Sequence, residues 1–489
     1  MNLMNMTSQT LTGNTITSRR GSRTHHSIGF WVTAVAFLLN MGFSAVPTPL
    51  YVLYQQRDGF SGLMVTVVYA VYAVGVIGSL FLGGHLSDWI GRRHIFVPAL
   101  LVNALSAVIF ILEPGLGGLI VARILSGVSI GLTTATATSY LAELRATARP
   151  SSSPRYAEAV ATGSNLGGIG FGPLVAGLLA QFAPAPLVLP YIVFGGGLVV
   201  TALLVAISPE TVRRPDSRPR YRPQRVAVPA QHRPLFYAAT LAGLAAFAVY
   251  GVFNSLVPSF LAGTLHEPSH ALAGAVPFAA FAGGAAAQIA GARIGSLALL
   301  RRSVPIVVLG LALTAGAMWA TSLAMFVIAG VIVGVGAGMV FKGAVGVVAS
   351  TAPAGARAEV LSGFFLGAYI GLSLPVIGLG VATQYIPARE AMLVFAALAA
   401  LTIGGSVRAV IKRAGETDHG SRRRPISKTG RMRSHAHARA CARTRVRSGM
   451  HLAEPGERCD SAPPRSEDQS RAKRSSSATR SSGADRKGA

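Results

Sequence analysis

Long apolar segments alternate with short polar ones along most of the chain. A helix that crosses about 30 Å of hydrocarbon needs roughly 20 predominantly apolar residues in a row. Twelve segments meet this requirement, six of them before and six after a polar stretch near residue 220. The sequence therefore predicts twelve membrane-spanning helices, over residues 29–54, 62–84, 94–112, 117–141, 157–182, 187–207, 236–263, 271–296, 304–321, 323–350, 358–386 and 390–411.

The loops between these spans differ in charge. One set of alternate loops carries almost all the basic residues, namely Arg92, Arg93, Arg145, Arg149, Arg155, seven arginines from Arg213 to Arg233, Arg293, Arg301, Arg302 and Arg357. The opposite loops carry only Arg57 and Arg389. Because Lys and Arg are retained on the cytoplasmic side, we expect the basic loops and both termini to be cytoplasmic.

Composition divides the chain further. The predicted units are a cytoplasmic N-terminal segment (1–28), an N-terminal six-helix bundle (29–207), a basic cytoplasmic linker rich in Pro and Arg (208–235), a C-terminal six-helix bundle (236–412) and a basic tail (413–489). The first apolar run is too long for a signal peptide, so we expect it to remain as a membrane anchor.

The charge is concentrated outside the apolar body. The chain is 51% hydrophobic and only 13% charged, and residues 412–489 alone hold 20 Lys or Arg against 8 Asp or Glu. That tail has almost no Leu or Ile, so we expect it to be disordered, either as a functional basic segment or as a read-through extension. Its His435, His437, Cys441 and Cys459 match no structural zinc spacing. We therefore predict no metal site and no cofactor.

The two groups of six spans contain related stretches. The second span of each group ends similarly, in GGHLSDWIGRR (83–93) and in GARIGSLALLRR (291–302). The fifth spans also agree, as GGIGFGPLVAGLLAQF (167–182) and GAYIGLSLPVIGLGVATQY (367–385). Repeats of this kind are typical of transporters. The predicted fold class is an all-α polytopic membrane protein with two pseudo-symmetric six-helix bundles.

The loop after the second span carries the most specific motif. Gly84, Leu86, Asp88, Gly91, Arg92 and Arg93 fit the pattern G-x-L-x-D-x-x-G-R-R. Weaker matches are AELR with Glu143 after the fourth span, SPETVRR after the sixth, and ARILSGVSIG in the fourth. On these residues the chain resembles a twelve-span transporter of the major facilitator superfamily across about residues 28–412.

Two interpretations of this loop remain open. Asp88 could cap the start of the third helix while the arginines anchor the loop in the cytoplasm, which is a purely structural role. The resemblance implies instead that the loop locks the two halves together in one state and releases them in another. On that interpretation Glu143 is expected to pair with Arg92 or Arg93, and Arg357 with Asp88.

Two cations lie within the predicted spans and at least five residues from either end. Arg123 is in the fourth span and Lys342 in the tenth, where a charge is costly unless it has a function or reaches the membrane surface. The resemblance implies that spans one, four, seven and ten line a central pathway. Both cations would then face it, together with Asn40 of span one and Asn254 of span seven. Snorkelling to the surface is the alternative for both cations.

Acidic residues give a further expectation. Glu113, Glu143, Glu267, Glu359 and Glu390 lie at span ends or in loops. Arg123 and Lys342 would place positive charge in the pathway, and none of these acidic residues lies deep enough in a span to balance it. This charge favours an organic anion or a neutral metabolite as the substrate.

The fifth span suggests an alternative. Gly168, Gly172, Pro173 and Gly177 resemble a motif of proton-coupled antiporters, which favours multidrug efflux, although close helix packing explains the same residues. In either case we expect a monomeric, proton-coupled carrier in a bacterial inner membrane, which is not an enzyme and binds no nucleic acid.

Overall fold

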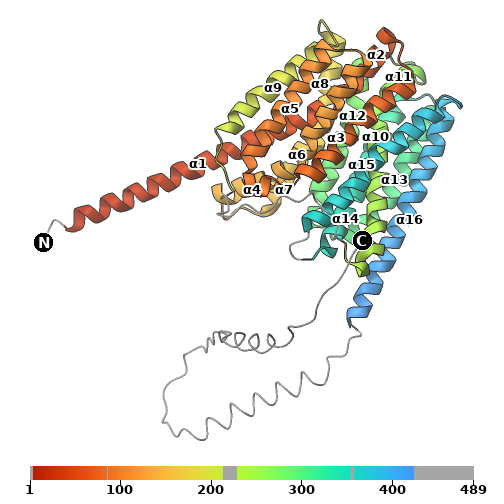
Figure 1. Cartoon of the computed structure of the whole chain (residues 1–489). Helices are drawn as coiled ribbons and strands as arrows, with labels where there is room; N and C mark the ends of the chain where they lie inside the picture. Colours follow the sequence, from red (N-terminus) through yellow and green to blue (C-terminus); the bar gives the residue numbers. More distant parts are fainter. Residues whose placement is uncertain (1–3, 85, 213–227, 354–356, 423–489) are drawn as a thin grey trace, which may run out of the picture. The chain divides into compact units, whose positions relative to one another are not determined.

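The computed structural model describes residues 4–84, 86–212, 228–353 and 357–422. Within these ranges every regular element is a helix (Figure 1). Twelve helical segments are long and apolar enough to cross a membrane, as the sequence predicts. The elements are α1 Met4–Ala45, η1 Thr48–Leu50, α2 Tyr51–Asp58, α3 Gly62–Gly83, α4 Ser87–Ile90, α5 Arg92–Leu112, α6 Leu116–Ala148, α7 Pro154–Thr162, the π-helical turn η2 Gly163–Gly167, α8 Gly168–Phe182, α9 Leu189–Ala206, η3 Ala230–His232, α10 Arg233–Ser255, α11 Val257–Gly263, α12 His270–Ala290, η4 Gly291–Arg293, α13 Ser296–Trp319, α14 Leu323–Thr351, α15 Arg357–Ala382 and α16 Ala388–Arg422.

The first six and the last six spans pack in the same way. In the first group α6 contacts α1, α3 and α5, and α1 also contacts α8. In the last group the equivalent α14 contacts α10, α12 and α13, and α10 also contacts α15. The two groups are therefore pseudo-symmetric six-helix bundles, called here the N-terminal half and the C-terminal half. They meet through α8 against α12 and α3 against α15, which are equivalent pairs in the repeat.

Small residues bring the helices of each half close together. A Cβ on Gly75 of α3 would overlap the backbone of Ile124 in α6, and one on Gly127 of α6 would overlap the carbonyl oxygen of Tyr72. Glycine is needed here because lipid supplies little driving force for helix association, so close backbone packing must supply it. Large side chains such as Leu203 and Leu401 face outward instead, at 65% and 73% exposure.

Several predicted boundaries were wrong. The ninth span begins at Ser296, eight residues early, because two exposed arginines at its start continue the helix. The seventh ends at Ser255 and is followed by the separate helix α11. The twelfth span was predicted to end at 411, but Lys412, Arg413 and Ala414 are good helix formers that extend the helix beyond the apolar run, and α16 ends at Arg422.

The domain assignment stays a prediction. The described spans belong to one compact unit, Met1–Gly420, and Ser421–Ala489 form a second unit. Of the predicted linker, residues 213–227 lie outside the described residues, as do residues 423–489 of the tail, including the two histidines and two cysteines considered for zinc.

Candidate functional site: a central cavity and its charged mouth

A cavity of about 850 Å³ lies between the two halves. Its deep end is lined by Arg123 and Asn254, and its shallow end by Asp88 and Arg357. Since Asp88 and Arg357 lie at helix ends, the cavity opens at the end of the bundle that carries the loop 84–91. This end is called the mouth.

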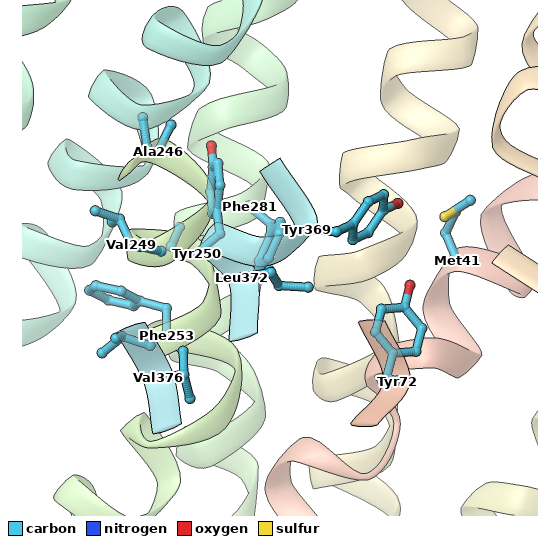
Figure 2. Packing of buried hydrophobic residues seen from close by; sticks show 14 of the residues in the cluster. Met41, Tyr72, Ala246, Val249, Tyr250, Phe253, Phe281, Tyr369, Leu372 and Val376 are labelled. Atoms are coloured by element: carbon cyan, nitrogen blue, oxygen red, sulfur yellow. The ribbon is translucent and has the colours of Figure 1, made fainter. Parts of the chain in front are cut away.

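Aromatic side chains line the cavity between these ends. Figure 2 shows Met41 and Tyr72 of the N-terminal half facing Tyr250 and Phe281 of the C-terminal half, with Tyr369 reaching between them. A largely apolar cavity with a few polar groups is the usual form of a small-molecule site.

The opposite end is closed by hydrogen bonds between the halves. The Thr48 hydroxyl donates to the backbone oxygen of Asn254 at 2.8 Å and to its side-chain Oδ1 at 3.0 Å. The backbone N–H of His270 donates to Gln181 at 2.9 Å. Asn254 thus lies at the boundary between the cavity and this closed end.

At the mouth, Arg92 is the centre of a charged cluster. Its guanidinium contacts Asp88 at 2.5 Å and Glu143 at 2.9 Å, and it also donates to Ser87 at 2.8 Å. Arg92 therefore pairs with Glu143, one of the partners expected from the sequence. Asp88, however, pairs with Arg92 within the same half and not with Arg357, which lines the cavity from the C-terminal half.

The N-terminus of the third span is capped by a residue that sequence reasoning did not select. Asp88 was one candidate for this role, but it lies in the separate short helix α4. Glu210 instead accepts hydrogen bonds from the backbone N–H groups of Arg92 and Arg93, at 2.9 and 3.0 Å. Burial opposes ionisation of Glu210, but backbone hydrogen bonds from Val212 and Arg92 outweigh it and lower its pKa.

Gly91 makes room for this cap. Its φ of +114° is strained for any residue with a side chain, and a Cβ there would lie 2.6 Å from a carboxylate oxygen of Glu210. The next residues also face this region: Arg93 donates to the carbonyl oxygens of Ala206 and Ser208, and His94 Nδ1 lies 3.1 Å from Glu210. The structure therefore explains His94, for which the sequence suggested no role. Gly84 lines the cavity beside this cluster.

Arg123 is buried at the deep end, with a side chain that is 1% exposed. It donates to the carbonyl oxygens of Ser44 and Tyr69, and its guanidinium lies over the rings of Tyr72 and Tyr69, at 4.7 and 5.4 Å from their centroids. This burial excludes the snorkelling interpretation. Its Nε has no partner, and no carboxylate pairs with it among the described residues.

Asn40 does not reach the cavity. It is fully buried behind the wall, where its side chain donates to Thr133 at 3.0 Å and accepts from Asn103 at 2.8 Å. The sequence places Asn40 in the pathway, whereas in the structure the neighbouring polar residues of the N-terminal half hold its side chain in their own hydrogen-bond network. Asn40 is therefore a packing residue of that half.

Lys342 lines the cavity nearer the mouth. Its Nζ lies 3.2 Å from a carboxylate oxygen of Glu158 in α7 and donates to the backbone oxygen of Gln288 at 2.7 Å. Glu158 was passed over in the sequence because it is the second residue of a predicted span. The side-chain Nε2 of Gln288 is buried without a partner.

The glycines of the fifth-span motif lie at close helix contacts. A Cβ on Gly168 or Gly172 would overlap the backbone of α1, at Leu38 and Gly42. Gly177 in turn touches the backbone of α12 at His270, and Gly274 of α12 lies against the carbonyl of Pro173. The motif therefore packs α8 between one helix of its own half and one of the other.

Twelve spans in two repeated halves around a cavity between them are the architecture of a membrane carrier. A model of the Major Facilitator Superfamily matches residues 32–318, more than half of the chain, and the chain belongs to this family. It is thus an integral multi-pass membrane protein that transports a solute, and members of this family are carriers rather than enzymes.

Two further similarities are narrower. The arabinose-proton symporter of Bacillus subtilis (strain 168) is 34% identical over 91 residues, which are 19% of this chain and 19% of that protein. The chain therefore matches about a fifth of that relative's length. The crystal structure of a bacterial homologue of the human lysosomal transporter Spinster, inward-facing and unoccupied, is similar with a TM-score of 0.57 at 14% identity. That similarity covers 80% of this chain and 98% of that one, and it shows the fold alone.

Proposed function

We propose that this chain is a proton-coupled secondary carrier that moves an organic anion by alternating access. Residues 29–207 would rock against residues 236–412, so that the central cavity opens to one side of the membrane at a time. The basic residues of the mouth loops support a cytoplasmic mouth and cytoplasmic termini. The membrane would be a bacterial inner membrane, and the carrier would act as a monomer.

The observation that carries the proposal is the unpaired charge of Arg123. A buried cation is costly when no carboxylate compensates it, and breaking a buried pair costs several kcal/mol for the same reason. Two carbonyl oxygens and two tyrosine rings stabilise the guanidinium only in part. The carboxylate of a solute that enters from the mouth would complete the site, so the binding energy would favour anions over neutral or cationic compounds.

Proton coupling has separate support. The relative from Bacillus subtilis is a proton symporter by name, although the match is short. No nucleotide-binding loop of the G-x-x-x-x-G-K-[ST] type occurs in the sequence, so an ion gradient is the simplest energy source.

Proton-coupled multidrug efflux is the second candidate, and the fifth-span motif is the observation that favours it. The close contacts of Gly168 and Gly172 account for that motif by packing alone. A cationic drug would also meet the unpaired Arg123 at the deep end of the cavity. We therefore place efflux of cations behind transport of an organic anion.

The test is transport by the purified protein in liposomes. Saturable uptake and counterflow of a carboxylate, driven by an imposed pH gradient, are the expected results. Transport that saturates but is indifferent to the gradient would contradict the coupling. Preference for cationic drugs over carboxylates would favour the efflux alternative.

A further inference from the structure

One ion pair differs from the others in this chain. Among the described residues five ion pairs occur, and four of them join residues of the N-terminal half to one another or to Glu210, which follows its last helix. The fifth joins Glu158 of the N-terminal half to Lys342 of the C-terminal half. Within the described part of the chain, a movement of one half against the other would therefore change this ion pair and leave the other four in place.

The two partners are held differently. Lys342 is 19% exposed and also donates to the Gln288 carbonyl oxygen of α12, so its ammonium keeps a partner if the pair breaks. Glu158 is 57% exposed, and it lines the cavity, so its carboxylate is accessible to solvent from the mouth. A proton can therefore reach Glu158 without crossing the protein interior.

Other charged groups surround this pair. On α6, which packs against α7, the guanidinium of Arg145 lies 4.2 Å from the ring centroid of Tyr156 and donates to Ser152. The element α12 contributes the uncharged Gln288. The remaining charged residues that line the cavity are Asp88, Arg92, Arg123 and Arg357. Of the two carboxylates of the cavity wall, Asp88 already pairs with Arg92 of its own half, so Glu158 alone pairs across the halves.

A proton can bias a conformational equilibrium only through a group whose interactions differ between the conformations. A contact that stays within one half, such as Arg92 with Glu143, can survive a rigid-body movement of the halves. A contact that joins the two halves near the mouth is broken when the halves move apart there. This argument rests on the proposed alternating access of the two halves.

We propose that Glu158 is the group through which protons act on this carrier. When Glu158 is ionised it holds α7 against α14 at the mouth. When a proton from the mouth side binds its carboxylate, the ion pair is lost, Lys342 keeps its charge and its bond to Gln288, and the two halves separate more freely there. The expected effect is about a two- to fivefold change in the ratio of the two arrangements, because the pair is partly exposed.

The experiment measures distances across the mouth in the full-length protein. Cys441 and Cys459 are replaced by Ser, and spin labels are placed at Arg155→Cys in α7 and Ser350→Cys in α14, both exposed. Distance distributions are recorded by pulsed electron paramagnetic resonance in lipid nanodiscs, from about pH 8 to about pH 4. No solute is required.

The expected result is a shift towards longer distances on acidification. Glu158→Gln should show the long-distance distribution at every pH, and Lys342→Gln should do the same by removing the other partner. Glu390→Gln, a carboxylate at the closed end, should respond to pH as the parent protein does. A pH response that persists in Glu158→Gln would overturn the proposal, and so would a parent protein whose distances do not change with pH.

The liposome assay separates this proposal from the function on which it rests. Uptake driven by the pH gradient in both the wild type and Glu158→Gln would overturn the role of Glu158 and leave the proposed carrier intact. Uptake that ignores the gradient already in the wild type would overturn the proposed coupling itself.

Discussion

Thr48 and Asn254 join the two halves at the closed end, where one hydroxyl donates to both the backbone and the side-chain oxygen of the same asparagine. Thr48 is 1% exposed and Asn254 is 5% exposed, so water cannot replace these bonds easily. This contact has to break before the cavity can open on the other side of the membrane.

Thr48→Val should therefore favour opening of the closed end. A lost hydrogen bond of this kind changes the free energy by about 0.5–1.5 kcal/mol, which is roughly a two- to tenfold change in the ratio of conformations. Spin labels at Glu113→Cys and Tyr385→Cys would report longer distances across this end. Thr402→Val, which removes a hydroxyl bonded only to its own helix, is the control and should leave the distances unchanged.

Asp88→Asn tests the role of the mouth loop. The substitution weakens the 2.5 Å contact with Arg92 but leaves the cap of the third span to Glu210. We expect normal insertion and a thermal midpoint close to that of the wild type, but a transport rate about two- to tenfold lower. Transport at the wild-type rate would instead support a purely structural role for Asp88.

Gly91→Ala should destabilise the protein. Backbone strain at φ +114° costs about 1–3 kcal/mol, and the new Cβ also approaches the Glu210 carboxylate. Gly59 is a matched control, because it also has a positive φ, of 70°, but open space around it. Thermal unfolding in detergent should show a larger loss for Gly91→Ala than for Gly59→Ala, and equal losses would argue against crowding at Glu210.

Acid should weaken the cap at Glu210. Because folding lowers the pKa of Glu210, its stabilising contribution is present above the carboxyl's unfolded pKa and is lost as the pH falls through the lower, folded value. Glu210→Gln should therefore be less stable than the wild type at neutral pH, and the difference should shrink in acid. Thermal unfolding of both proteins across pH measures this, and a constant difference would exclude the linkage.

Much of the fold follows from the sequence. Lipid requires long apolar helices, so the number of spans can be counted from the apolar runs. Helix ends are harder to predict, because polar residues such as Arg301 and Arg302 extend a helix beyond the apolar run.

The site could be predicted only in part. Arg123 and Lys342 were conspicuous as cations within apolar runs, and both line the cavity. Asn40 carries the same kind of signal but turns away into a local network, which depends on Asn103 and Thr133 from other helices. Glu158 gave no signal, and Glu210 stood out only within SPETVRR and not as a helix cap, since their partners are 184 and 118 residues away.

Uptake of carboxylates by liposomes containing wild-type protein or Arg123→Gln tests the central claim most directly. The assay compares labelled mono- and dicarboxylates with sugars and cationic drugs under an inward pH gradient. Arg389→Gln, which removes an exposed arginine stacked on Trp319, is the control. We expect saturable carboxylate uptake by the wild type. Uptake should fall by about 10- to 100-fold in Arg123→Gln, because a charged hydrogen bond to the solute is lost. Uptake by the Arg389→Gln control should equal that of the wild type. Carboxylate uptake by Arg123→Gln at the wild-type rate would contradict the central claim.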